Sequence, residues 1–200
     1  MSKKIDSRAA DLLDGIFSNT IALHDEVRRG GVTPVLEAAA LIVSALDGGG
    51  KLLAFGNGGS AADAQHLAAE LVGRFERNRS AMAAIALTAD AAVLTSVAND
   101  EGYDRVFARQ VEGLGRAGDV AFGISTSGTS PSVVAALEAA RARGMKTIAL
   151  TGRDGGPAGR VADVHVNVPS GSTARVQEVH RTLLHAICAL VEGAIAGDGR

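Results

Sequence analysis

The sequence predicts an α/β protein in which helices cover both faces of a parallel sheet. Five short apolar runs of strand length recur along the 200 residues, helical patterns separate them, and three of the runs lead directly into Gly, Ser or Thr. This alternation is typical of a parallel sheet, because each crossover helix packs back on the sheet that it connects.

Two helices are expected before the first strand. Apolar residues fall at helical intervals over residues 6–29, and Gly30 and Gly31 end this segment. A second helix is expected over 34–46, closed by glycines at 48–50. No repeat, low-complexity tract or linker interrupts the chain, so residues 1–200 are expected to form one domain with residues 1–48 as an N-terminal helical extension.

The remaining elements follow from the same patterns. A helix is expected over 60–75, another opens at Pro131, and a long one covers 174–196 with a continuous apolar stripe. The strands are expected at 52–55, 83–87, 120–124, 147–150 and 164–168.

Composition narrows the classes of function. The net charge of −2 shows no excess of cations, which argues against a nucleic acid partner. The N-terminus lacks the apolar core of a secretory signal, and no run approaches the length of a bilayer span, so we expect no membrane association. The single cysteine, Cys188, excludes an intrachain disulfide and favours a cytoplasmic setting.

Two loops have the composition of anion sites. GNGGS at 56–60 follows one strand, and STSGTS at 125–130 follows another. Backbone N–H groups, hydroxyls and helix N-termini can together bind a phosphate without a cationic side chain. Neither loop matches a nucleotide motif, so a sugar phosphate is favoured over a nucleotide. Turn geometry alone remains an alternative explanation for each loop.

Two helices repeat a spacing of four residues between polar side chains. His66, Glu70 and Arg74 would share one helix face, and Gln177, Arg181 and His185 another. Two imidazoles, a carboxylate and an amide oxygen could bind zinc, or Glu70 and His185 could transfer protons without a metal. A surface ion pair is the alternative for His66 and Glu70, and a buried structural histidine is the alternative for His185.

Long ordered motifs run along nearly the whole chain: GNGGSAADAQH at 56–66, AAELVGRF at 68–75, LTAD at 87–90, ANDEGYDRVFARQV at 98–111, GDVAFGISTSGTSPSV at 118–133, ARGMKTIALTGRDGG at 142–156 and RVQEVH at 175–180 with His185. They resemble those of the sugar isomerase (SIS) domain family. The resemblance implies a flavodoxin-like three-layer α/β/α sandwich with a five-stranded parallel sheet and an added N-terminal helical region. It also implies a homotetramer whose active sites form between subunits.

The resemblance also implies a role for individual positions. Glu70 would be the general base and His185 the general acid, and Arg74 matches a further active-site arginine. The phosphate would be held by Ser60, Ser125, Thr126, Ser127 and Ser130, with Asn57, Gly58 and Gly59 beside them. The sugar would meet Asn99, Asp100 and Gln177. In members that contain a metal, one zinc ion per subunit is bound at the positions of His66, Glu70, Gln177 and His185.

The implied reaction converts D-sedoheptulose 7-phosphate to D-glycero-D-manno-heptose 7-phosphate through an enediolate. It is the first step towards nucleotide-activated heptose for surface polysaccharide such as lipopolysaccharide. One departure from the family is Ala174, where some members carry an acidic residue, and it affects a secondary polar contact.

Other functions within the family are possible alternatives. A non-catalytic relative binds the bacterial replication initiator, but it resembles a protein without the glutamate and the final histidine, and this chain has both Glu70 and His185. Isomerisation of a shorter sugar phosphate is another alternative. A sugar-sensing regulator would carry a DNA-binding domain, for which the chain leaves no room.

Overall fold

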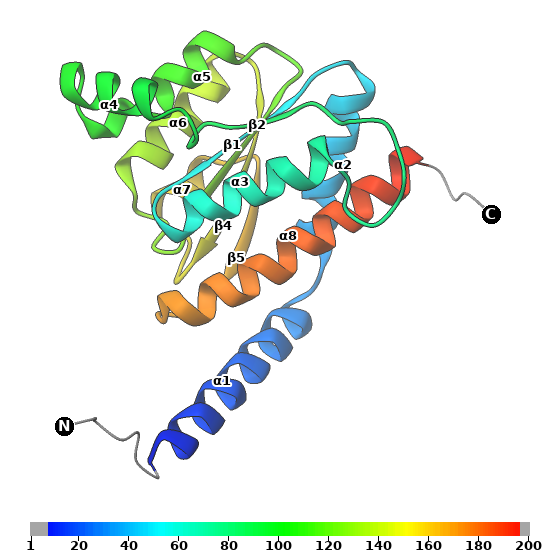
Figure 1. Cartoon of the computed structure of the whole chain (residues 1–200), viewed down its shortest axis with the longest axis vertical. Helices are drawn as coiled ribbons and strands as arrows, with labels where there is room; N and C mark the ends of the chain where they lie inside the picture. The colour runs from blue at the N-terminus through cyan, green and yellow to red at the C-terminus, as the bar shows by residue number, and fades with distance from the viewer. Residues whose placement is uncertain (1–7, 197–200) are drawn as a thin grey trace, which may run out of the picture.

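The computed structural model describes residues 8–196, and strands alternate with helices along the chain after two N-terminal helices (Figure 1). The strands are β1 (Leu52–Gly56), β2 (Ala84–Ala86), β3 (Val120–Ser125), β4 (Lys146–Gly152) and β5 (Val164–Val168). The helices are α1 (Arg8–Gly30), α2 (Thr33–Asp47), α3 (Gly59–Val72), α4 (Ala91–Asp100), α5 (Ala108–Leu114), α6 (Pro131–Ala142), α7 (Gly156–Val161) and α8 (Thr173–Ala196), with a short 3-10 turn η1 (Tyr103–Arg105). The expected start of the first helix at residue 6 and both ends of the expected domain lie outside the described residues.

The five strands form one parallel sheet in the order β2-β1-β3-β4-β5, which confirms the predicted fold class. Every residue of β1 and β3 is buried, as expected for central strands covered on both faces. Gly56 at the end of β1 pairs with Ile124 near the end of β3. The two glycine- and serine-rich loops therefore leave the sheet side by side, at the point where the strand order reverses and where open α/β sheets bind ligands.

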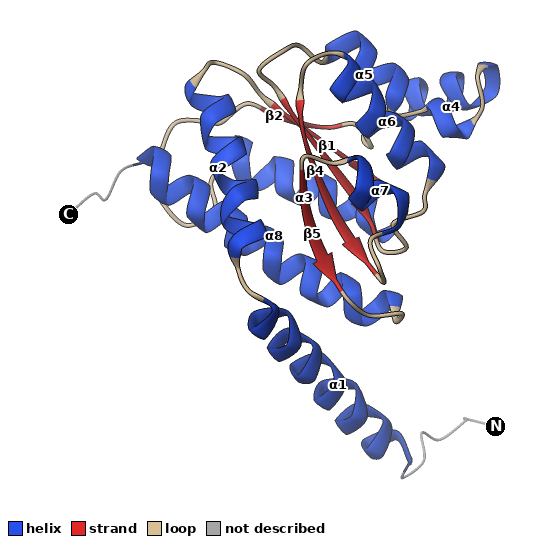
Figure 2. Cartoon of the chain, turned by 180° about the vertical axis from the view of Figure 1, so that it is seen from behind, coloured by secondary structure: helices blue, strands red, loops and turns tan. Residues whose placement is uncertain are grey.

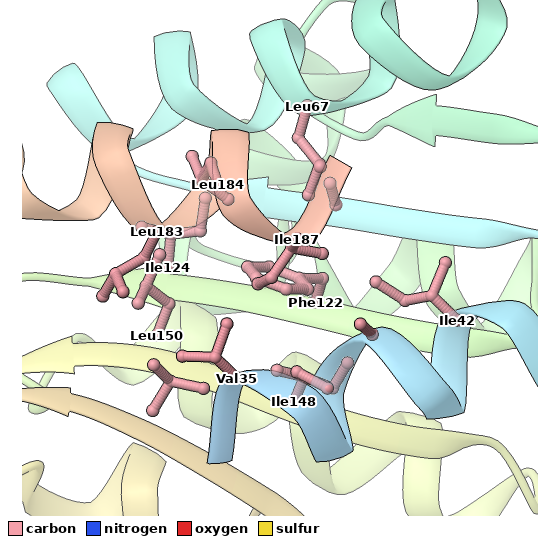
Figure 3. Packing of buried hydrophobic residues seen from close by; sticks show 14 of the residues in the cluster. Val35, Ile42, Leu67, Phe122, Ile124, Ile148, Leu150, Leu183, Leu184 and Ile187 are labelled. Atoms are coloured by element: carbon pink, nitrogen blue, oxygen red, sulfur yellow. The ribbon is translucent and has the colours of Figure 1, made fainter. Parts of the chain in front are cut away.

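Helices cover both faces of the sheet (Figure 2), and alternate strand residues face two separate hydrophobic clusters. Residues such as Phe122 and Ile148 pack against α2, α3 and α8 on one face. Figure 3 shows Leu67 of α3 and Ile187 of α8 meeting Phe122 in this layer. On the other face, residues such as Phe55 pack against α5, α6 and α7. The three-layer arrangement follows from the period of two in the strands.

One expectation about apolar runs is wrong. Among residues 8–196, α8 is long and apolar enough to cross a membrane. Helices α1 and α2, which bend by 75° at their junction, are long and apolar enough only if the two are taken as one span. However, the buried side chains of α8 include Val176, Leu184 and Ile187, which pack in the core on one face of the sheet. Core helices of soluble proteins can be equally long and apolar.

The expected helix over 60–75 is too long at its C-terminal end. The third helix ends at Val72, and Gly73 leaves helical geometry with φ −75° and ψ −103°. Arg79, which follows in the chain, binds carbonyl oxygens of the last turn that no helical N–H could reach. Arg74 therefore lies beyond the helix and does not continue the spacing of His66 and Glu70.

The loop after β3 packs closely on the loop after β4. Gly128 has φ +69°, and a Cβ placed there would lie 2.2 Å from the carbonyl oxygen of Gly155. The N–H of Ala158 in α7 donates to the Gly128 carbonyl at 2.9 Å. A glycine is needed at 128 for two reasons, its left-handed backbone and the close approach of a second loop.

The two reasons can be separated by substitution. Gly118 also has positive φ (+93°), but a Cβ there would meet nothing within 4 Å. We expect Gly118→Ala to lower the free energy of unfolding by about 1–2 kcal/mol, the cost of the left-handed backbone alone. Gly128→Ala should cost roughly 3 kcal/mol or more, because the clash with backbone cannot be relieved by a rotamer change. Urea denaturation measures both, and equal losses would show that the loop contact contributes nothing.

Candidate active site

The turn between β1 and α3 holds the amide of Asn57 in one orientation. Its Nδ2 donates to Ser132 Oγ at 3.0 Å, and its Oδ1 accepts from the hydroxyl of Tyr103 at 2.8 Å. Gly58 (φ +57°) turns the chain into α3, where Ser60 is buried and its N–H donates to the Asn57 carbonyl. The turn therefore presents fixed polar groups at the carboxyl edge of the sheet. Tyr103 was not singled out in the sequence, although it lies in the motif with Asn99 and Asp100.

The turn between β3 and α6 gathers hydroxyl groups at the start of a helix. Ser125 Oγ lies 3.1 Å from Ser130 Oγ and 3.4 Å from Ser127 Oγ, and it accepts from the N–H of Gly128 at 3.1 Å. The side chain of Ser130 makes no capping hydrogen bond to α6. Thr126 is half-buried in the same turn. Neutral hydroxyls and the N-terminus of a helix of twelve residues together make an arrangement that can bind a phosphate group.

Helices α3 and α8 bring two histidines and a glutamate together. The Nε2 atoms of His66 and His185 are 2.8 Å apart, and Glu70 Oε1 lies 3.4 Å from His66 Nε2. The His185 ring also contacts the ring of Phe75, with centroids 5.4 Å apart. The helix spacing in the sequence left open whether the two faces meet, and in the structure they do.

The surroundings keep His66 uncharged. Burial lowers the pKa of His66 and the neighbouring charge of Arg181 lowers it further, while Glu70 partly opposes this. The imidazole is therefore neutral at pH 7, the form that can accept a proton or bind a metal ion. In contrast, burial and then the charges of Glu70 and Glu192 raise the pKa of Cys188 to about 12, which excludes this thiol as a nucleophile at neutral pH.

An ion pair between a buried carboxylate and a partly exposed arginine accompanies the cluster, and it was not predicted from the sequence. Arg181 Nη2 lies 2.6 Å from Oδ1 of Asp63, whose side chain is buried. Burial raises the pKa of Asp63, whereas the charges of Arg181 and His66 act to lower it. Arg181 shares the four-residue spacing of Gln177 and His185, and Asp63 precedes His66 by three residues on the same helix. Residues three apart on a helix lie on one face, so this spacing is the feature of the sequence that points to Asp63 as a neighbour of His66.

Gln177 of α8 lies directly on the first loop. A Cβ on Gly59 would be 2.3 Å from Nε2 of Gln177, so a side chain at position 59 would displace the Gln177 amide from this position. Gly59 and Gln177 line a cavity of about 410 Å³ together with Asp63 and Arg181. Ala174, the position at which some family members carry an acidic residue, lines the same cavity.

The donor atoms of the cluster are of the types that zinc prefers, namely imidazole nitrogen and carboxylate oxygen. The Nε2 atoms of His66 and His185 face each other at 2.8 Å, and Glu70 Oε1 lies 3.4 Å from His66 Nε2. Over residues 8–196, no group of three or more His, Cys, Asp or Glu side chains has an arrangement that would hold a metal ion as it stands. The chemistry of the donors fits zinc, and the His66–His185 contact would have to open to admit it.

Three residues assigned from the family resemblance lie outside this cluster. Asn99 and Asp100 are exposed at the end of α4, and Asn99 Nδ2 donates to Asp100 Oδ1 at 2.8 Å. Arg74 is exposed beyond the end of α3. Within one chain, the site thus consists of the two loops, His66, Glu70, Gln177 and His185.

Comparison with known proteins identifies the family of the chain. A family model described as SIS domain matches residues 17–152. The phosphoheptose isomerase of Neisseria meningitidis serogroup A is 50% identical over 182 residues, which cover 90% of this chain and 92% of that protein. The phosphoheptose isomerase of Citrifermentans bemidjiense is 53% identical over 173 residues, covering 86% and 90%.

A solved structure shows the same architecture. The phosphoheptose isomerase GmhA from Neisseria gonorrhoeae matches with a TM-score of 0.88 and 47% identity, covering 92% of this chain and 99% of that chain. On the extent of these matches, the chain belongs to the SIS domain family and, within it, to the phosphoheptose isomerases.

Proposed function

We propose that the protein interconverts D-sedoheptulose 7-phosphate and D-glycero-D-manno-heptose 7-phosphate in the cytoplasm, as the first step towards nucleotide-activated heptose. The observation that carries the proposal is the cluster of His66, Glu70 and His185 beside two loops suited to a phosphate. The names of relatives that are about 50% identical support the substrate. The single cysteine, which is buried, agrees with a reducing compartment.

The reaction moves one proton between adjacent carbons and another between their oxygens. In the proposed mechanism, Glu70 removes the carbon-bound proton, which leaves an enediolate intermediate. Glu70 then returns the proton to the neighbouring carbon. His185 donates and accepts the proton at the oxygens. The neutral state of His66 suits a partner that hydrogen-bonds His185 without adding a charge next to it.

The far end of the substrate would be anchored by the hydroxyl-rich loop. Ser125, Ser127 and Ser130 would exchange their mutual hydrogen bonds for bonds to the phosphate oxygens. Asn57 would lie beside the phosphate, and Gln177 would hold sugar hydroxyls between the phosphate and the reacting carbons. Binding energy from the phosphate then orients carbons that lie some distance away.

Replacing the proposed base tests this mechanism. Glu70→Gln keeps the shape of the side chain but removes its basicity, so kcat with sedoheptulose 7-phosphate should fall by about 10²–10⁴-fold. Glu138→Gln, at an exposed position of α6, is the matched control and should keep full activity. Product NMR gives the rates and identifies the aldose, and circular dichroism checks the fold. Near-normal turnover of Glu70→Gln would remove Glu70 from the mechanism, and no isomerised sugar from the unaltered protein would favour the non-catalytic binding role.

We also propose one zinc ion per subunit, held by His66, Glu70, Gln177 and His185. The support is the donor chemistry of the cluster and the neutral state of His66. Zinc bound there would supply Lewis-acid polarisation of the substrate carbonyl.

Metal content tests the zinc proposal apart from activity. After dialysis against zinc and then against metal-free buffer, elemental analysis should find about one zinc per chain in the unaltered protein. His66→Ala should retain less than about a tenth of that. His24→Ala is the control, because His24 bonds Thr20 and Thr182 away from the cluster. Equal zinc in the two variants would exclude His66 as a ligand.

The assembly is proposed to be a homotetramer with active sites between subunits. α1 extends from the body of the molecule (Figure 1) and exposes large apolar side chains along one side, with Leu13, Phe17 and Ile21 each more than half exposed. A second copy of the chain would cover this surface, which a soluble monomer rarely leaves open to water. The exposed residues Arg74, Asn99 and Asp100 would then meet the active site of a neighbouring subunit.

The mass in solution tests the assembly. Light scattering should give four chains for the unaltered protein and a smaller assembly for Phe17→Glu, because a charge would be buried in the interface. Asn19→Glu adds the same charge on the opposite side of α1 and should leave the mass unchanged. A monomer at micromolar concentration, or equal masses for the two variants, would contradict the proposed interface.

A further inference from the structure

A carboxylate is buried in the last turns of α8, far along the helix from Gln177. The side chain of Glu192 is 2% exposed. It accepts hydrogen bonds from the backbone N–H groups of Phe75 at 3.1 Å and of Glu76 and Arg77 at 2.8 Å each. Burial by itself raises the pKa of Glu192, but these N–H groups and the charge of Arg79 outweigh it and lower the pKa, so the group is ionised at neutral pH.

Arg79 joins this carboxylate to the end of α3. Its Nε donates to Glu192 Oε1 at 3.0 Å. Its Nη2 donates to the carbonyl of Glu70 at 2.7 Å, and its Nη1 to the carbonyl of Leu71 at 2.8 Å. Nη1 also donates to the carbonyls of Gly73 at 3.3 Å and Ser80 at 3.0 Å. These include the carbonyls that a helix leaves unpaired at its C-terminus, so the guanidinium caps the helix that carries Glu70.

The same ion pair also fixes the neighbour of His185. The N–H of Phe75 donates to Glu192, and the Phe75 ring lies against the His185 ring. Glu192 and His185 lie on α8, whereas Glu70 lies on α3 and Phe75 lies in the segment that follows α3. The pair therefore holds the backbone of Glu70 and the packing partner of His185 against the same rigid helix.

Stability alone is a weak explanation for such a pair. Replacing a buried ion pair by apolar residues is often neutral or stabilising, because the charges must be removed from water. The chain contains a second buried carboxylate of the same kind. Asp119 is 3% exposed and accepts from the N–H groups of Lys51 and Arg116 and from Lys51 Nζ, next to the starts of β1 and β3 and outside α3 and α8. It shares the architecture of the Glu192 site but not its neighbours, which makes it a matched control.

We propose that Arg79 and Glu192 are positioning residues of the active site, which hold Glu70 and His185 at the separation that proton transfer needs. The inference rests on the proposed function of those two side chains. Neither Arg79 nor Glu192 touches the proposed substrate site itself.

The kinetic test compares Glu192→Gln and Arg79→Lys with Asp119→Asn. Arg79→Lys keeps the charge but loses the planar fork that reaches Glu192 and the carbonyls at once. We expect kcat with sedoheptulose 7-phosphate to fall about 10–100-fold in both variants, because a displacement of about 1 Å is enough for such a loss. KM should stay within about twofold, since the phosphate loops are untouched. Asp119→Asn should lower the melting temperature comparably and leave kcat unchanged.

A second measurement does not depend on activity. The ring ¹H–¹⁵N resonances of His66 and His185 should shift in Arg79→Lys, where no charge has changed, and should stay in place in Asp119→Asn. If the unaltered protein does not isomerise the sugar, the proposed function fails and these resonances still decide whether the pair positions the rings. Values of kcat equal to that of Asp119→Asn, or unchanged ring resonances in Arg79→Lys, would overturn the inference.

Discussion

The packing of α3 and α8 on the same face of the sheet is the contact on which the candidate site depends. Leu67 of α3 and Leu184 and Ile187 of α8 are buried in the same cluster with the strand residues (Figure 3). Once these apolar sides face the sheet, the residues next to them along each helix must face the other helix. This is why His66 and His185 meet although they are 119 residues apart in the chain.

The parallel sheet supplies the other half of the site. Because the strands run in one direction, the loops that follow β1 and β3 leave from one edge, and the first turns of α3 and α6 lie beside them. Hydroxyls, backbone N–H groups and helix N-termini gather at this edge, and such groups can bind an anion without cationic side chains. Close approach between segments, as at Gly59 and Gly128, makes the edge compact enough for these groups to converge.

Within residues 8–196, the buried carboxylates lie where segments are held together, and each has a cationic partner. Asp63 pairs with Arg181, Asp119 with Lys51, and Glu192 with Arg79. Two of these pairs touch the helices that carry the candidate catalytic groups. Buried histidines that are not part of the cluster have a different character: His180 donates to the carbonyl of Thr151, and its pKa is lowered to about 4 by burial, which keeps it neutral.

Several features of this protein could be predicted from the sequence because they are local. The period of apolar residues defined the strands and the long helices, the glycine and hydroxyl content marked both loops, and the spacing of four residues placed His66 with Glu70 and Gln177 with His185. The end of α3 was predicted wrongly because Arg79, seven residues beyond Val72, and Glu192, more than 100 residues away, decide it together. Only the tertiary structure determined that the two helix faces meet, which charges are buried and which strands are neighbours. Those properties depend on contacts between residues that are distant in the chain, and the local periodicity of a sequence carries no record of them.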